Sequence, residues 1–78
     1  MIDSFDWDEI SKSKKGVRTK DNKACGIVVA SEGDHIWVVD GAVALKKYRI
    51  PKLKVKFYNG AEIILKIPTF LLQEYEYQ

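Results

Sequence analysis

The fold is decided by residues 48–60, which read Tyr48-Arg49-Ile50-Pro51-Lys52-Leu53-Lys54-Val55-Lys56-Phe57-Tyr58-Asn59-Gly60. Proline lacks the backbone N–H that a strand ladder needs, so the Ile50-Pro51 step predicts a corner between two strands. After this corner, lysines and apolar residues alternate over 52–57, which indicates a strand with one wet face and one buried face. Asn59-Gly60 then marks the turn of a hairpin whose second strand is expected at 61–67.

The register of this hairpin follows from its two faces. A two-residue Asn59-Gly60 loop would set Lys56 opposite Ile63 and mix charged with apolar side chains. Because a slip of one residue exchanges the two faces, a three-residue loop that ends at Gly60 is expected instead. Gly60 then takes the left-handed position of a bulged turn. The expected pairs are Phe57 with Ala61, Val55 with Ile63 and Leu53 with Leu65.

Further β-rich runs precede this hairpin, separated by turn signals at roughly ten-residue spacing. Gly26 lies inside one of them and predicts a bulge or a close approach of two backbones. The run at 17–20 is short and alternating, which suits an edge strand. The expected strands are 17–20, 24–30, 35–40, 43–50, 52–57 and 61–67. Short strands of this number and spacing predict an all-β fold, a small six-stranded antiparallel barrel that spans about 16–67.

Short helices are expected at both ends of this barrel. Residues 1–11 suit a short helical turn in which Asp6 is the N-terminal cap and Ile10 lies on the buried face. Near the other end, Thr69 can cap a terminal helix over about 69–76.

Composition excludes several classes of protein. The chain has 78 residues, a formal net charge of +2 and a single cysteine, Cys25. This length predicts a single domain over 1–78, and the lone cysteine excludes an internal disulfide and fits a reducing, cytoplasmic setting. Cys25 opens an apolar run and is expected to be buried and inert. An apolar segment of the ~20 residues that a bilayer span requires is absent, so no membrane span is expected.

The sequence offers no constellation of residues for catalysis or metal binding. His35 is the only histidine and stands at the start of an expected strand, where a solvated residue is the simpler interpretation. One histidine and one cysteine cannot supply the four ligands of a structural zinc site. The glycines stand singly at turns and bulges, so no phosphate-binding loop is expected. The protein is therefore predicted to be non-enzymatic and to need no cofactor or metal.

Basic residues gather between 46 and 56, a segment without any acid. A solubilising strand face and a contact surface for nucleic acid or an acidic protein are both consistent with this block. Tyr58 is expected on the same face, where its ring could stack on a base. The candidate basic patch consists of Lys46, Lys47, Arg49, Lys52, Lys54 and Lys56.

A second candidate surface is apolar. On the strand at 35–40, Ile36 and Val38 point to one face and Trp37 and Val39 to the other, so one of these pairs faces outward. An outward Trp-Val pair needs a cover, which the terminal helix and a second copy of the chain can share. We therefore expect a homodimer, with other protein partners of unidentified kind. The candidate residues are Trp37, Val39, Leu72 and Tyr75.

A spaced set of residues carries a family resemblance: Trp7, Val17, Thr19, Asp21, Gly26, Val28, Tyr48, Ile50, Pro51, Lys52, Val55, Gly60, Ile63 and Leu65. This pattern resembles the PRC-barrel family, especially its small stand-alone archaeal members, over roughly residues 16–72. The resemblance implies a non-enzymatic adaptor that binds protein, in archaeal cell division or in RNA-related assembly, and it also implies dimers. The alternative is a small nucleic-acid-binding β-barrel that uses the lysine-rich strand face.

Overall fold

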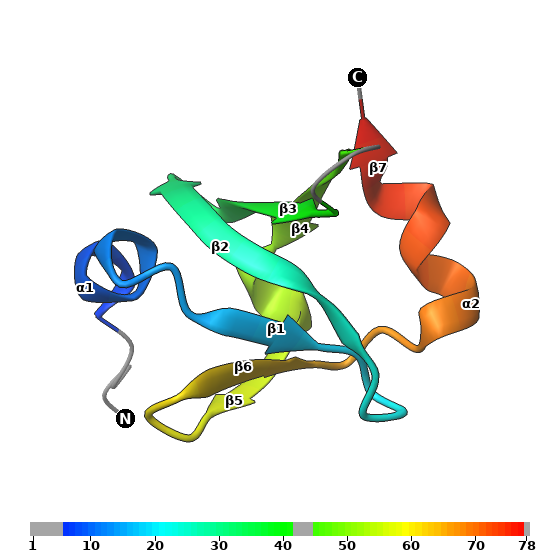
Figure 1. Ribbon diagram of the computed structural model, residues 1–78, viewed down its shortest axis with the longest axis horizontal. Helices are drawn as coiled ribbons and strands as arrows, with labels where there is room; N and C mark the ends of the chain where they lie inside the picture. The colour runs from blue at the N-terminus through cyan, green and yellow to red at the C-terminus, as the bar shows by residue number, and fades with distance from the viewer. Residues whose placement is uncertain (1–5, 42–44, 78) are drawn as a thin grey trace.

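The computed structural model describes residues 6–41 and 45–77 (Figure 1). The predicted start of a strand at 43 and the first part of the helical turn predicted over 1–11 lie outside the described residues. The elements are α1 (Trp7–Lys12), β1 (Gly16–Arg18), β2 (Ala24–Glu32), β3 (His35–Asp40), β4 (Lys46–Pro51), η1 (Lys52–Lys54), β5 (Val55–Tyr58), β6 (Glu62–Leu65), α2 (Thr69–Leu72), η2 (Gln73–Tyr75) and β7 (Glu76–Tyr77). The protein is mostly β, as predicted.

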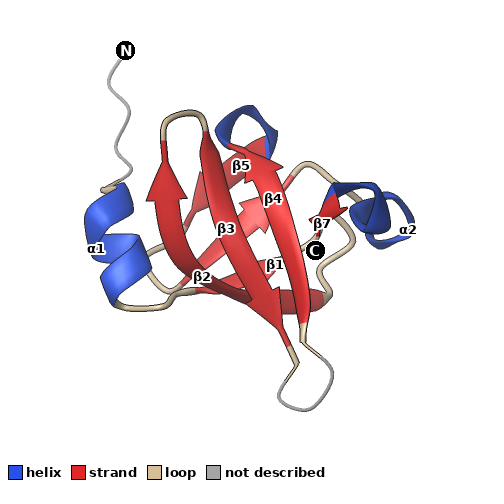
Figure 2. Ribbon diagram, turned by 90° about the horizontal axis from the view of Figure 1, so that it is seen from above, coloured by secondary structure: helices blue, strands red, loops and turns tan. Residues whose placement is uncertain are grey.

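All seven strands form one mixed sheet in the order β5-β6-β1-β2-β3-β4-β7. The β1–β6 pair is parallel, and the other five pairs are antiparallel. The sheet curls around a core, but no ladder joins the edge strands β5 and β7 in the described residues (Figures 1 and 2). The prediction of a closed, six-stranded antiparallel barrel is therefore wrong.

The pairing of β1 is the first difference from the predicted barrel. This short strand was expected at an edge, yet it pairs with β2 on one side and with β6 on the other. Its Val17 lies opposite Gly26 of β2 and Ile63 of β6, and it is buried between them. Because β6 pairs with β1, β5 on its other side is left as an edge strand.

The connection that begins at Ile50-Pro51 contains more residues than the sequence indicates. Lys52–Lys54 forms a turn of 3₁₀ helix rather than the start of a strand, and Leu53 is 83% exposed. Pro51 has an extended ψ of 137°, and the N–H of Lys52 donates to the carbonyl of Asp34 at 2.7 Å. The prediction of a continuous strand over 52–57 is wrong, because the chain needs these residues to pass from β4 to β5.

The β5–β6 hairpin also has a different register from the predicted one. Val55 lies opposite Leu65, and the ladder then shifts, so that Tyr58 lies opposite Ile63. This irregularity between Val55 and Phe57 reverses the faces of the residues that follow. Phe57 is consequently 45% exposed rather than buried, and Tyr58 packs against the core.

The Asn59 side chain stabilises the turn of this hairpin. The Asn59 Oδ1 accepts hydrogen bonds from the N–H groups of Ala61 (2.9 Å) and Glu62 (2.8 Å). Gly60 has a φ of +94°, so the predicted positive backbone angle at this glycine is confirmed. The predicted loop of Tyr58-Asn59-Gly60 is wrong, because Tyr58 is the last residue of β5 and is paired with Ile63.

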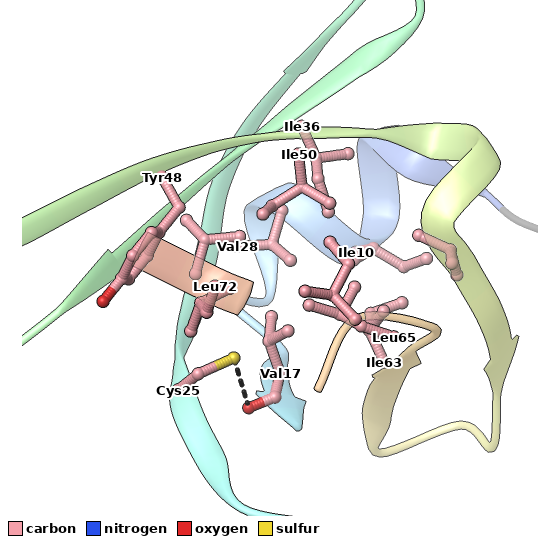
Figure 3. Close-up of a cluster of buried hydrophobic side chains, with 13 residues drawn as sticks. Ile10, Val17, Cys25, Val28, Ile36, Tyr48, Ile50, Ile63, Leu65 and Leu72 are labelled. Carbon is pink, nitrogen blue, oxygen red and sulfur yellow. Dashed lines mark hydrogen bonds between the residues drawn. The ribbon is translucent and has the colours of Figure 1, made fainter. Parts of the chain in front are cut away.

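The core fills the inside of the curled sheet (Figure 3). Strands β1 to β6 send side chains into it, and α1 and α2 contribute from either end. Ile10 of α1 is fully buried, and the Asp6 carboxylate accepts the N–H of Glu9 at 3.2 Å, which confirms Asp6 as the cap. The buried apolar residues are Ile10, Val17, Cys25, Val28, Ile36, Val38, Tyr48, Ile50, Val55, Ile63, Leu65, Ile67 and Leu72.

Cys25 is part of this core, as predicted. Its thiol donates to the carbonyl of Val17 at 3.4 Å, and burial raises the thiol pKa to about 12, with a smaller contribution from the charge of Asp40. Because the thiolate is the reactive form, the side chain is unreactive at neutral pH.

The helix near the C-terminal end of the described chain is shorter than predicted. Only Thr69–Leu72 is α-helical; a 3₁₀ turn and the two-residue strand β7 follow. Pro68, not Thr69, occupies the cap position of α2. The Thr69 hydroxyl and its N–H instead donate to the Asp21 carboxylate at 2.9 and 3.0 Å, so the predicted capping role of Thr69 is wrong.

Candidate protein-interaction surface

The side of β2, β3 and β4 that points away from the core is here called the outer face. On β3, Ile36 and Val38 are buried, so the alternation of the strand turns Trp37 and Val39 outward. Paired residues share a face of the sheet. Trp37 is paired with Ala30 and Arg49, whereas Val39 is paired with Ile27 and Lys47, so these four neighbours also lie on the outer face.

A bulge adds one more apolar residue to this surface. The β2–β3 register shifts between Val28 and Ala30, which leaves Val29 as the extra residue of β2. Val28 is fully buried, and Val29 beside it is 37% exposed. The bulge thus places Val29 on the outer face between Ile27 and Ala30.

Trp37 lies at the centre of the outer face and contacts side chains from two other strands. Its ring centroid is 5.0 Å from that of Tyr77 on β7, with an interplanar angle of 57°. The Arg49 guanidinium lies over the Trp37 ring at 5.5 Å from its centroid, in reach of a cation–π interaction. Tyr77 reaches this position because it pairs with Lys47 at the end of the sheet.

In the described part of the chain, neither α1 nor α2 covers the outer face. In Figure 2 the strands β2, β3 and β4 lie toward the viewer, with α1 on one side of them and α2 on the other. Ile27 is 37% exposed and Tyr77 is 39% exposed, while Trp37 and Val39 are partly buried by their neighbours. An outward-facing apolar group with Trp, Tyr and Arg at its centre contains the residue types that are enriched in protein interfaces.

The structure places the four predicted self-association residues in two different parts of the molecule. Trp37 and Val39 lie on the outer face, but Leu72 is 6% exposed and belongs to the core, where Tyr75 also packs. The terminal helix therefore does not share a surface with Trp37. Its place beside Trp37 is taken by Tyr77, which sequence reasoning missed; the alternation Tyr75-Glu76-Tyr77 is a strand signal that could have located it.

The predicted basic patch is divided as well. Lys47 and Arg49 lie on the outer face, and Lys46 pairs with Asp40 at the end of the β3–β4 ladder. Lys54 and Lys56 are exposed on η1 and β5, at the opposite end of the strand order. The 3₁₀ turn and the bulge interrupt the alternation that would have aligned these lysines.

Lys52 and Tyr58 have structural roles instead. The Lys52 ammonium lies over the Trp7 ring at 5.2 Å from its centroid, which joins η1 to α1. The Tyr58 hydroxyl donates to the carbonyl of Gly60 at 3.1 Å, and its ring packs against the core. The expectation that Tyr58 lies on the lysine face is therefore wrong.

The side chains of residues 6–41 and 45–77 also bear on metal binding and on membrane crossing. No group of three or more His, Cys, Asp or Glu residues in that part of the chain could hold a metal ion. His35 is half-buried at the start of β3, next to Glu32 across the ladder. Neither of the described helices has the length and apolar character needed to cross a membrane.

Comparison with known proteins yields no matching family model, no matching curated protein and no matching solved structure.

Proposed function

We propose that this protein is a non-enzymatic interaction module that acts as an adaptor and binds protein through the outer face. The observation that carries the proposal is the apolar group Ile27, Val29, Trp37 and Val39, which no helix of the described chain covers. Leaving such a group in water is unfavourable by roughly 25 cal/mol per Å² of apolar area, so a partner that covers it gains that free energy.

The first partner we propose is a second copy of the chain. A domain of 78 residues buries a modest fraction of its surface, and association of two copies through the outer face would enlarge its core. The PRC-barrel resemblance supports an adaptor that forms dimers, and it implies cell division or RNA-related assembly as the setting. Because the sheet is not a closed barrel, that support comes from the sequence pattern rather than from the fold.

Sedimentation equilibrium of matched variants tests the proposal. Wild-type protein is expected to form dimers in the micromolar to high micromolar range. Ile27→Asp places a charge on the outer face and should give a monomer, whereas Leu53→Asp makes the same kind of change at an exposed apolar residue on η1 and should leave the dimer intact. A wild-type protein that remains monomeric at the highest concentration would refute self-association.

The nucleic-acid alternative is tested in the same preparation. Binding of a single-stranded oligonucleotide with a steep decrease of affinity in salt would indicate several phosphate contacts and favour that function. We expect no such binding, because the lysines do not form one continuous stripe and the two contacts of the Trp37 ring leave it poorly placed to stack on a base.

A further inference from the structure

Two opposite charges lie at diagonally opposite corners of the outer face. Glu32 on β2 is paired with His35, the first residue of β3. Lys47 on β4 is paired with Val39, near the other end of β3. Since β2 and β4 flank β3 on opposite sides, the line from Glu32 to Lys47 crosses β3 near Trp37.

Both corner residues are exposed, and neither has an ion-pair partner in the described part of the chain. The ion pair found there joins Arg18 of β1 to Glu62 of β6, with 3.0 Å between the Arg18 Nε and the Glu62 Oε1. The corner charges are thus available to a molecule that covers the apolar centre between them.

This arrangement is self-complementary. When two copies pack face to face around a two-fold axis, the direction of that axis determines which corner of one copy meets which corner of the other. A two-fold axis that lies between the two faces, at right angles to the Glu32–Lys47 diagonal and across its midpoint, exchanges these two corners, so acid meets base twice. An axis along the same diagonal would place Glu32 against Glu32 and Lys47 against Lys47, which is repulsive.

We propose that a second copy of the chain occupies the outer face around a two-fold axis near Trp37, with Glu32 of each copy opposite the partner's Lys47. This inference rests on the proposed function and adds the orientation of the dimer and the residues that determine it. The apolar centre supplies the affinity, and the corner charges select one of the possible arrangements.

Charge reversal tests this orientation by sedimentation equilibrium at low salt. Glu32→Lys and Lys47→Glu should each weaken the homodimer roughly tenfold, because two exposed attractive pairs become two repulsive ones. The matched control is Lys54→Glu, which makes the same charge change as Lys47→Glu but on η1. It should leave the dissociation constant unchanged. Circular dichroism of each variant confirms that it is folded.

Mixing the two reversed variants gives the sharper result. In a one-to-one mixture of Glu32→Lys and Lys47→Glu chains, every corner contact becomes a lysine–glutamate pair again. The mixture should therefore associate about as tightly as wild-type protein, and the double variant with both reversals should do the same as a homodimer.

Three outcomes would overturn the inference. If wild-type chains dimerise but both single reversals behave like Lys54→Glu, the corner contacts are wrong while self-association stands. If the single reversals weaken the dimer and mixing does not restore it, the two corners do not face each other. A monomeric wild-type protein would remove this inference together with the self-association on which it rests.

Discussion

Gly26 shows how one residue permits two strands to approach closely. Its φ is +132°, a value that side-chain-bearing residues rarely adopt. A Cβ atom at this position would lie 2.4 Å from the carbonyl oxygen of Val39 and 3.0 Å from the Val38 side chain. Because the obstructing atom belongs to the backbone of β3, it cannot move without disturbing the ladder.

We predict that Gly26→Ala destabilises the protein by about 2–4 kcal/mol, from backbone strain together with the steric conflict. The measurement is the free energy of unfolding in urea. Gly16→Ala is the matched control, since a Cβ there meets only the Glu62 side chain at 3.5 Å, an ordinary contact. Equal stability of the two variants would contradict this account of Gly26.

At the scale of elements, a hydrogen-bonded group joins the β1–β2 turn to the start of α2. The Thr19 hydroxyl donates to the Asp21 carboxylate at 2.6 Å, and Thr69 donates to the same carboxylate through its hydroxyl and its N–H. Thr19 is fully buried, and its hydroxyl lies 3.0 Å from that of Thr69, which joins two segments that are distant in the sequence. The hydrogen bond from Thr19, with smaller ones from Thr69, lowers the pKa of Asp21 from 3.8 to about 2.

The sign of the resulting pH dependence follows from this lowered pKa. A carboxylate that titrates lower in the folded chain stabilises the fold fully above its unfolded pKa, and this contribution disappears as the pH falls. We therefore expect the thermal midpoint of the wild type to decrease between pH 4 and pH 2 in part through Asp21. Asp21→Asn should lower the midpoint at pH 7 and reduce the acid-induced decrease.

The control for this prediction is Asp34→Asn, which changes an exposed carboxylate that makes none of these hydrogen bonds. It should retain the wild-type midpoint at pH 7. If Asp21→Asn and Asp34→Asn have the same midpoint at every pH, the hydrogen-bonded group does not stabilise α2.

Local sequence signals predicted elements well where one residue type decides the backbone. Asp6 caps α1, β3 has the predicted bounds of 35–40, Gly26 lies at the predicted close approach of two backbones, and Gly60 has the predicted positive φ. The 52–57 segment shows where such signals fail. Its lysine–apolar alternation is typical of a strand, but the first three residues are used to cross between strands, and a bulge reverses the remainder.

At the scale of the whole molecule, pairings between distant segments could not be read from the sequence. The β1–β6 pair and the short strand β7 depend on which elements lie side by side after folding. Periodicity reports which face of a strand is buried and not which strand is its neighbour. For the candidate surface, Trp37 and Val39 were predicted as interface residues, whereas Tyr77 depends on the β4–β7 pair and was missed.

Self-association at the outer face should also affect stability. A partner that binds only the folded chain raises the melting temperature by mass action, so the midpoint should increase with protein concentration. Differential scanning calorimetry over a hundredfold range of concentration measures this increase. We expect the increase for wild type and for Leu53→Asp, and a constant midpoint for Ile27→Asp; a constant midpoint for all three would contradict the proposed dimer.

The position of β1 has a consequence for the order in which the chain folds. Val17 and Ile63 lie opposite each other, although most of the sequence separates them. Bringing such distant segments together costs loop-closure entropy before any contact is gained, which slows folding. The β2–β3–β4 meander, made of neighbours in sequence, can assemble first. During synthesis, the edge of β1 that is not paired with β2 has no partner until β6 emerges, so the nascent chain would expose the inner side of the meander until that strand is made.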